Sequence, residues 1–228
     1  MRALIEKLMF VKACLKVIKN PLKRAEFYYQ TDRLADPAVF ADIFSRLNAD
    51  ALCKEAILKN KKVKPYSLHD LAAFPEGSFG NAYLIYIKKH KVRIGQQAII
   101  KNQPMSYIRY RDQQYHHIWK TLLNYDTSIQ DEMAYQAFNY AQLNSTNSVL
   151  LIVLTLTHSL IYDRDNIKNI FNAITDGYSK GKKMPLIWGL PFEEYFSEPL
   201  ADVREKYLRM RAVSADQKTD LSKKEITA

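Results

Sequence analysis

Polar side chains that could do chemistry gather in one predicted helix near the middle of the sequence. They are Arg111, Asp112, His116, His117 and Lys120. His116 and Lys120 are four residues apart and therefore share one face of a helix. Adjacent residues point about 100° apart on a helix, so His116 and His117 cannot both line one site without distortion. Imidazole and cationic side chains in this arrangement fit a metal site or a site for an anionic group.

A carboxylate near the start of the next predicted helix could complete this site. A short turn around Asn124 would fold Glu132 back toward Lys120. Glu132 also has a purely structural interpretation. Ser128 and Asp131 resemble a capping box, and a carboxylate in a first turn complements the helix dipole whether or not it binds a ligand. From the residues alone, both interpretations remain open.

The glycine and proline content predicts that these residues are positioned by an all-α fold. Only six glycines occur, about a third of average usage, which argues against the many tight turns of a sandwich or barrel. The eight prolines fall at or near breaks between segments of helical period. We predict a single domain of about eight or nine helices. Their ranges are 3–19, 21–31, 37–58, 79–91, 104–123, 128–142, 149–162, 165–178 and 199–210.

The first of these helices carries the clearest periodic signal. An apolar stripe recurs at spacings of four and three, formed by Leu4, Leu8, Val11, Leu15 and Ile18. Three lysines flank it, namely Lys12, Lys16 and Lys19. Such a helix either packs its stripe on a core, which is the commoner case and our prediction, or lies on an anionic membrane with its lysines at the headgroups.

Three segments can be distinguished along the chain. Residues 1–20 form the basic amphipathic helix, residues 21–210 the main helical domain, and residues 211–228 a polar tail that we expect to be frayed. Residues 149–161 are apolar but fall short of the roughly 20 residues that span a bilayer. No transmembrane segment is predicted.

Charge and cysteine content narrow the class of partner and compartment. The chain has 228 residues, 47% of them hydrophobic, and a formal net charge of +10, which favours an anionic partner such as membrane headgroups or nucleic acid. Nucleic acid is the weaker hypothesis because zinc-finger spacing and an RNA-recognition signature are absent. Cys14 and Cys53 are too few for a disulfide framework, so a reducing compartment is expected. Phosphate-loop and dinucleotide fingerprints are absent as well.

Several spaced motifs resemble the ubiquinone-biosynthesis Coq4 family. The central motif comprises Tyr110-Arg111, residues 116–120, residues 125–128, Glu132, residues 136–138 and Ala141-Gln142. Outer matches are residues 74–80, Gly177-Tyr178 with Gly181-Lys182 and Pro185-Leu186, and Pro199-Leu200 with Arg204. The resemblance covers roughly residues 36–210. It implies an all-helical fold that holds polyisoprenoid lipids, in a family assigned to coenzyme Q assembly as an organiser of the biosynthetic enzymes and as an oxidative decarboxylase of the quinone head group.

The sequence departs from this family at the metal motif. The family pattern is His-Asp-x-x-His followed after eleven residues by Glu, and it falls here on His116, His117, Lys120 and Glu132. A neutral imidazole in place of the carboxylate and a cationic lysine in place of the second histidine weaken a divalent site. We therefore expect at most a weakly held Mg²⁺ or Zn²⁺ on His116, His117 and Glu132. Alternatively, Lys120 with Arg111 or His117 pairs directly with an anionic lipid head.

The resemblance leads to a functional hypothesis with two alternatives. We expect a lipid-binding organiser in, or derived from, quinone biosynthesis that holds a long-chain isoprenoid lipid and associates with other quinone-biosynthesis proteins. The residues expected at the head group or anion are Arg111, Lys120, Tyr178 and Lys182, and those expected along the tail are Ala137, Ala141, Val149 and Val153. The alternatives are a metal-dependent head-group decarboxylase and a basic helical nucleic-acid-binding protein. We also expect the protein to be cytoplasmic, to associate peripherally with the membrane and to be able to form a homodimer.

Overall fold

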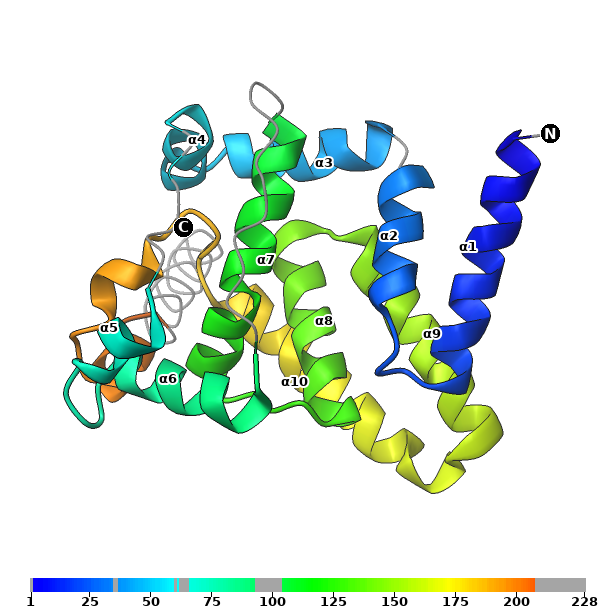
Figure 1. Cartoon of the computed structure of the whole chain (residues 1–228). Coiled ribbons are helices and arrows are strands. Elements are labelled where there is room, and N and C mark those ends of the chain that lie inside the picture. The colour runs from blue at the N-terminus through cyan, green and yellow to red at the C-terminus, as the bar shows by residue number, and fades with distance from the viewer. Residues whose placement is uncertain (1, 35–36, 60, 62–65, 93–103, 208–228) are drawn as a thin grey trace, which may run out of the picture. The chain divides into compact units, whose positions relative to one another are not determined.

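A computed structural model describes residues 2–34, 37–59, 61, 66–92 and 104–207, and within these ranges the chain is helical and has no β-strand (Figure 1). An isolated β-bridge joins Ser78 and Pro199. The prediction of an all-α fold is therefore confirmed. The helices are α1 (Arg2–Lys19), α2 (Ala25–Leu34), α3 (Pro37–Asn48), α4 (Ala51–Leu58), α5 (Leu68–Ala72), α6 (Phe79–His90), α7 (Pro104–Leu123), α8 (Ile129–Leu143), α9 (Thr146–Tyr162), η1 (Arg164–Asn166), α10 (Ile167–Lys183) and η2 (Phe192–Tyr195). Residues 200–207 are also helical.

The helices form two compact units, each assembled from two separate stretches of chain. Unit 1 takes its described residues from 1–49 and 126–181, and unit 2 takes its own from 50–125 and 182–228. Helix α1, which the sequence set apart as residues 1–20, is part of unit 1. The predicted tail, 211–228, lies outside the described residues. None of the described helices combines the length and the apolar character needed to cross a bilayer.

Unit 1 has an apolar core where α1, α2 and α9 meet. Its buried residues are Ala13, Val17, Phe27, Leu151 and Leu154, with Phe10, Cys14 and Ile18 of α1 packed against them. The ring centroids of Phe10 and Phe27 lie 6.3 Å apart. Small side chains at 13 and 14 let the α1 backbone approach this core closely.

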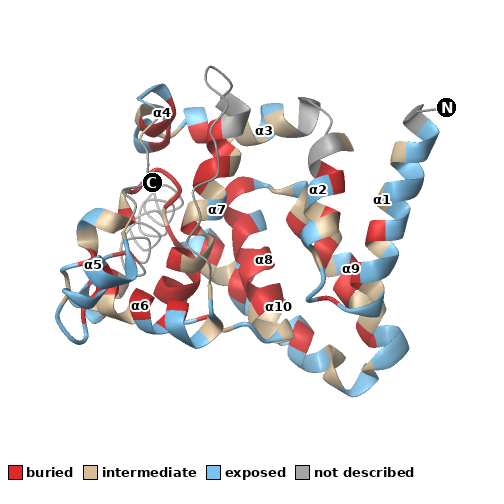
Figure 2. Ribbon diagram, viewed as in Figure 1, coloured by how far each residue is buried: buried red, intermediate tan, exposed pale blue. Residues whose placement is uncertain are grey.

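The leucine-rich stripe of α1 does not make this contact, as the exposed surface along α1 shows in Figure 2. The prediction that the stripe packs on a core is wrong for Leu4, Leu8, Val11 and Leu15, which are all more than half exposed. Only Ile18 of the predicted stripe reaches the core. Periodicity identifies an apolar face but not the face that a neighbour meets, and here the neighbour meets the face with the smaller side chains.

Unit 2 is held together by aromatic rings around the start of α6. The ring of Phe196 meets Phe79 edge-on at 5.4 Å and Phe74 edge-on at 5.8 Å. A Cβ on Gly80 would lie 2.6 Å from the Phe74 ring, so this position needs glycine. Ser78 caps α6 by accepting the backbone N–H of Asn81 at 3.2 Å, as the serine and glycines of residues 74–80 had indicated.

Several helix boundaries differ from the sequence-based expectation. The predicted helix 37–58 is broken into α3 and α4 by Asp50, whose extended backbone and side chain cap α4 at the N–H of Cys53. Asp competes with the helix for its own backbone hydrogen bonds, which ends one helix and begins the next. The prediction also missed α5 and η2, which are too short to show a period, and it ended α10 at Tyr178 instead of Lys183.

Two glycines of α10 set how closely this helix approaches α8. A Cβ on Gly177 would lie 2.0 Å from the carbonyl oxygen of Ala134, and one on Gly181 would lie 2.7 Å from the Cβ of Ala141. The first contact is with backbone, which cannot rotate away. The side-chain amide of Gln142 donates to the Gly181 carbonyl at 2.8 Å and adds a polar link between the two helices.

We predict that Gly177→Ala lowers the free energy of unfolding by about 1 to 3 kcal/mol, because the two helices must separate to admit a methyl group. The control is Asn172→Ala, an exposed position on the same helix, where alanine is the better helix former and should not destabilise. Urea unfolding followed by circular dichroism measures both. Equal stability of the two variants would contradict the close approach of α8 and α10.

Candidate functional site

Glu132 lies in the first turn of α8, the helix that the sequence predicted to begin with a cap. The Ser128 hydroxyl accepts the backbone N–H of Asp131 at 3.0 Å and donates to the Asp131 carboxylate at 2.7 Å, which confirms the predicted cap. The Glu132 side chain is directed inward and is 1% exposed. A carboxylate removed from water requires a counter-charge or several hydrogen bonds.

Arg24, which directly precedes α2, supplies that counter-charge within unit 1. Its Nη2 lies 2.8 Å from Glu132 Oε2. The side-chain amide of Gln136 donates to Glu132 Oε1 at 2.8 Å and to the Tyr28 hydroxyl at 3.3 Å. These contacts tie α2 to α8. The second terminal nitrogen of Arg24, Nη1, is buried and has no hydrogen-bond partner among the described residues.

Helix α9 adds two buried hydroxyl groups to this region. Thr155 is 1% exposed and Ser159 is fully buried, and within the described ranges neither hydroxyl has a hydrogen-bond partner. Asn139 of α8 donates to Ser148 of α9 at 3.3 Å, which sets the register of this antiparallel pair. Because the two helices run in opposite directions, the residue seven positions after Ser148 lies opposite the residue seven positions before Asn139. Thr155 is therefore level with Glu132. We call Arg24, Tyr28, Glu132, Gln136, Thr155 and Ser159 the polar cluster.

The polar cluster is suited to hold a polar head group. A guanidinium N–H donates to phosphate, carboxylate or carbonyl oxygens, and hydroxyl groups both donate and accept. Glu132 is already paired, so its charge is balanced before any ligand binds. The apolar core of α1, α2 and α9 belongs to the same unit, and Tyr28 of the cluster packs against it. A ligand with a small polar end and a long apolar part matches this composition.

Arg111, predicted to bind a head group, is instead saturated by contacts within unit 2. Its Nε donates to the Trp188 carbonyl at 2.9 Å, and its Nη2 donates to those of Gly189 and Leu190. Its Nη1 donates to the Lys61 carbonyl and to the Tyr107 hydroxyl. All five N–H groups of the guanidinium are thus used. A head group could bind Arg111 only by displacing one of these contacts.

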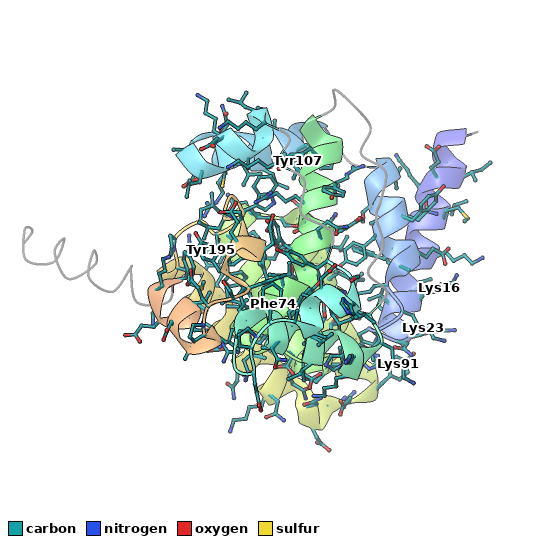
Figure 3. The ribbon with its side chains drawn as sticks, turned by 60° about the vertical axis from the view of Figure 1, so that its left-hand side comes forward. Lys16, Lys23, Phe74, Lys91, Tyr107 and Tyr195 are labelled. Atoms are coloured by element: carbon teal, nitrogen blue, oxygen red, sulfur yellow. The ribbon has the colours of Figure 1, made fainter. Side chains whose placement is uncertain are left out.

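Aromatic rings enclose the Arg111 guanidinium. Its carbon atom lies 4.5 Å from the ring centroid of Tyr115 and 5.2 Å from that of Trp188. Burial raises the pKa of the Tyr115 phenol, which stays protonated and donates to Glu193 at 2.6 Å. Tyr107, labelled in Figure 3, also donates to the Lys61 carbonyl at 2.7 Å. Arg111 therefore fastens α7 to the segment 188–190.

The other α7 residues that the sequence proposed as metal or head-group ligands also belong to unit 2. Lys120 is buried, and His116 and His117 are half-buried with ring centroids 4.8 Å apart and planes nearly perpendicular. The two rings thus meet edge to face. The prediction that they cannot both line one site stays a prediction. Glu132 belongs to unit 1. The predicted grouping of His116, Lys120 and Glu132 stays a prediction.

The side chains of the predicted metal motif do not form a suitable ligand set for a bound divalent metal ion. Lys120 stands where the family motif has a histidine, and both Glu132 oxygens already contact Arg24 or Gln136. Across the described ranges, no three side chains of His, Cys, Asp or Glu are placed to hold a metal ion.

The four residues predicted along a lipid tail fall in two environments. Ala137 and Ala141 of α8 are buried, whereas Val149 and Val153 of α9 are 38% and 50% exposed. Ala141 lies against the close approach of Gly181. The described structure therefore places the alanines, but not the valines, in an interior.

The remaining predicted residues lie at the surface. Tyr178 of α10 stacks on Tyr140 with ring centroids 6.1 Å apart, and both rings are partly exposed. Lys182 is exposed near the end of α10. Lys12 and Lys19 of α1 are also exposed, while Lys16 pairs with Glu26 of α2.

Sequence reasoning missed Arg24, Tyr28, Thr155 and Ser159 as members of a site. Arg24 was counted only as part of a basic end, because 108 residues separate it from Glu132 and no local spacing links the two. A signal did exist in α9, where Ser148, Thr155 and Ser159 repeat at spacings of seven and four inside an apolar helix. Hydroxyl groups on an inward helical face indicate a polar contact in the interior.

Comparison with known proteins agrees with this architecture. A crystal structure of a candidate ubiquinone biosynthesis protein from Nostoc punctiforme superposes with a TM-score of 0.76, at 20% sequence identity over 89% of this chain and 96% of that one. A COQ4 homolog 2 of Paramecium tetraurelia, named a mitochondrial ubiquinone biosynthesis protein, is 23% identical over 74% of this chain and 81% of its own length. The COQ4 homolog of Rattus norvegicus is 23% identical over 61% of this chain, which spans about half (53%) of that protein.

The fold is thus that of helical proteins linked by name to ubiquinone biosynthesis. The model of the family described as "Coenzyme Q (ubiquinone) biosynthesis protein Coq4" matches residues 2–212. The chain belongs to the Coq4 family, as its motifs predicted.

We expect Arg111→Lys to lower the free energy of unfolding by about 3 kcal/mol or more, because lysine cannot reproduce the planar fork and leaves buried carbonyls unpaired. Gln113→Ala on the exposed side of α7 is the control. Thermal and urea unfolding of both variants measure the effect. A near-parental Arg111→Lys variant would show that the guanidinium contacts are dispensable.

A double-mutant cycle tests the pair of Arg24 and Glu132. Arg24→Gln should cost about 3 to 5 kcal/mol, since it leaves the buried Glu132 carboxylate without its partner. Glu132→Gln should cost less, because the Arg24 side chain is 20% exposed. The double variant should cost less than the sum of the two. Additive losses would mean that the two side chains do not interact in solution.

Proposed function

We propose that this Coq4-family protein binds a long-chain isoprenoid lipid, either a prenyl quinone precursor or a prenyl phosphate, and that the polar cluster receives its head group. The observation that carries the proposal is the buried Nη1 of Arg24, a charged donor without a hydrogen-bond partner among the described residues. Leaving such a donor unpaired costs about 1 to 3 kcal/mol or more. A head-group oxygen would remove that cost.

The hydroxyl groups of Thr155 and Ser159 support the same assignment. Both are buried on α9, with Thr155 at the level of Glu132 and Ser159 one turn farther along, and an apolar ligand would not compensate them. Phosphate, phenol and quinone oxygens all accept hydrogen bonds from hydroxyl and guanidinium groups. The chemistry of the cluster therefore selects an oxygen-rich head and leaves its exact identity to binding measurements.

The tail is proposed to extend along α8. Ala137 is a short, buried side chain that follows Glu132 and Gln136 along this helix. Ala141 packs against Gly181 of α10, so it is not included in this path. The exposed Val149 and Val153 are not included in this path. His116, His117, Lys120 and Lys182 belong to unit 2 and are not part of the polar cluster, so their contribution to a head group stays a prediction from the sequence, as does that of Tyr178.

The biological role that we propose is that of a lipid-binding organiser in quinone biosynthesis, in contact with other enzymes of that process. Membership of the Coq4 family and the names of its relatives support this role. Those names place the relatives in mitochondria, whereas the sequence analysis expected the cytoplasm. Cys14 and Cys53 are both free thiols, which suits either reducing compartment.

Neither the decarboxylase nor the nucleic-acid alternative is carried into this proposal. The decarboxylase hypothesis needs Glu132 as a metal ligand, and that carboxylate is engaged with Arg24. The nucleic-acid hypothesis rests on net charge alone. Lipid binding is the hypothesis that specific contacts favour.

Thr155→Val separates a ligand site from a merely imperfect core. If the Thr155 hydroxyl binds a head group, the variant should bind a fluorescent prenyl phosphate about tenfold more weakly, a loss of about 1.4 kcal/mol. If nothing binds there, removing an unpaired hydroxyl should leave binding unchanged and stabilise the fold. Thr157→Val is the matched control, because the Thr157 hydroxyl already donates to the Val153 carbonyl at 2.9 Å.

The tail path is tested by enlarging Ala137. Ala137→Phe should weaken binding of the same probe while leaving the melting temperature near that of the parent, because the phenyl ring occupies the space of the tail. In a filled core the same change should cost about 1 to 3 kcal/mol of stability. Val153→Phe, at an exposed position, should alter neither property. A parent that binds no prenyl phosphate at micromolar concentration would overturn the proposal.

A further inference from the structure

The exposed face of α1 is an apolar surface of unit 1 that the core does not use. Its residues and their exposed fractions are Leu4 (63%), Leu8 (60%), Val11 (52%) and Leu15 (55%). Scattered exposed leucines are ordinary, but four on consecutive turns of one helix form a continuous stripe. Leu22, in the turn after α1, is 55% exposed as well.

Lysines border this stripe on both sides. At about 100° per residue, Lys7 projects beside one edge and Lys12 and Lys19 beside the other. All three are exposed, as is Lys23 in the following turn. Figure 3 shows Lys16 and Lys23 at the edge of the α1–α2 pair. Residues 1–24 hold seven basic side chains and one acidic one, Glu6.

A second exposed apolar strip lies on the neighbouring helix of the same unit. Val149, Val153 and Leu160 of α9 are spaced by four and seven residues, and 38% to 56% of each is exposed. Helices α1 and α9 pack on one another. Each helix contributes residues to the common core, and each also carries exposed apolar residues.

Charge decides between the two simplest occupants of the α1 face. In a symmetric pair of chains the same surface meets itself, so the lysine rows of two copies would face each other in an interface where lysine is normally depleted. An anionic bilayer instead neutralises the lysines at the headgroups while the leucines enter the acyl boundary. The surface therefore fits a membrane better than a second copy.

We propose that α1 lies in the surface of an anionic lipid bilayer, with Leu4, Leu8, Val11 and Leu15 inserted and the flanking lysines at the headgroups. The inward face, with Ala13 and Val17, keeps unit 1 attached to the docked helix. This docking deepens the proposed lipid-binding function, because a long isoprenoid lipid is supplied from a bilayer. It does not require that function, since the stripe and the polar cluster are separate residues.

Vesicle sedimentation tests the docking with the full chain. The parent should sediment with phosphatidylglycerol vesicles and much less with phosphatidylcholine vesicles, and added salt should reduce the difference. Leu8→Asp combined with Leu15→Asp should lower binding at least about tenfold, because two inserted side chains are lost. Lys12→Glu combined with Lys19→Glu should remove the preference for anionic vesicles.

Leu58→Asp is the matched control, since Leu58 is 72% exposed on α4 in unit 2 and should not affect vesicle binding. The leucine variants should retain parental helicity and prenyl phosphate binding in vesicle-free buffer, which distinguishes a failure of docking from a failure of the lipid site. Equal sedimentation of parent and Leu8→Asp/Leu15→Asp would overturn the proposal. A dimer in sedimentation equilibrium that these two substitutions dissociate would assign the face to a second copy instead.

Discussion

The burial of Glu132 is the constraint on which the arrangement of unit 1 depends. A carboxylate that is 1% exposed must be neutralised, and Arg24 does so at 2.8 Å from the start of α2. This pairing fixes where α2 meets α8, and the contact of Gln136 with Tyr28 adds a second link. Apolar replacements for such buried pairs are often equally stable. The pair is therefore better explained by the specific alignment of α2 with α8 that it imposes than by added stability.

Arg111 and Arg24 differ in how many of their guanidinium donors the protein itself uses. Arg111 uses all five donors on protein oxygens and lies between aromatic rings, so no hydrogen-bonding capacity is left for a ligand. Arg24 is paired through Nη2 but retains Nη1 as a buried donor. The Arg24 side chain as a whole is 20% exposed whereas Arg111 is 1% exposed, but the Nη1 atom of Arg24 is itself buried. The inventory of hydrogen bonds distinguishes them.

Helix α1 connects the interior of unit 1 with its surroundings. Its small residues pack on the core, and its leucines lie on the exposed side (Figure 2). A protein that holds a molecule with a long apolar tail must exchange it with a bilayer, since such molecules are scarcely soluble in water. An amphipathic helix on the unit that contains the polar cluster would keep that exchange short.

Local signals determined the helices, while long-range contacts decided the site. Proline and glycine placement predicted an all-α chain, the spacing of motifs predicted the Coq4 family, and Ser128 with Asp131 predicted the cap of α8, because each depends on residues close in sequence. The partner of Glu132 is 108 positions away, and Arg111 is saturated by residues that lie up to 79 positions away. The choice of inward face on α1 likewise required its neighbours. Periodicity measures which residues share a face, and only tertiary packing determines what that face meets.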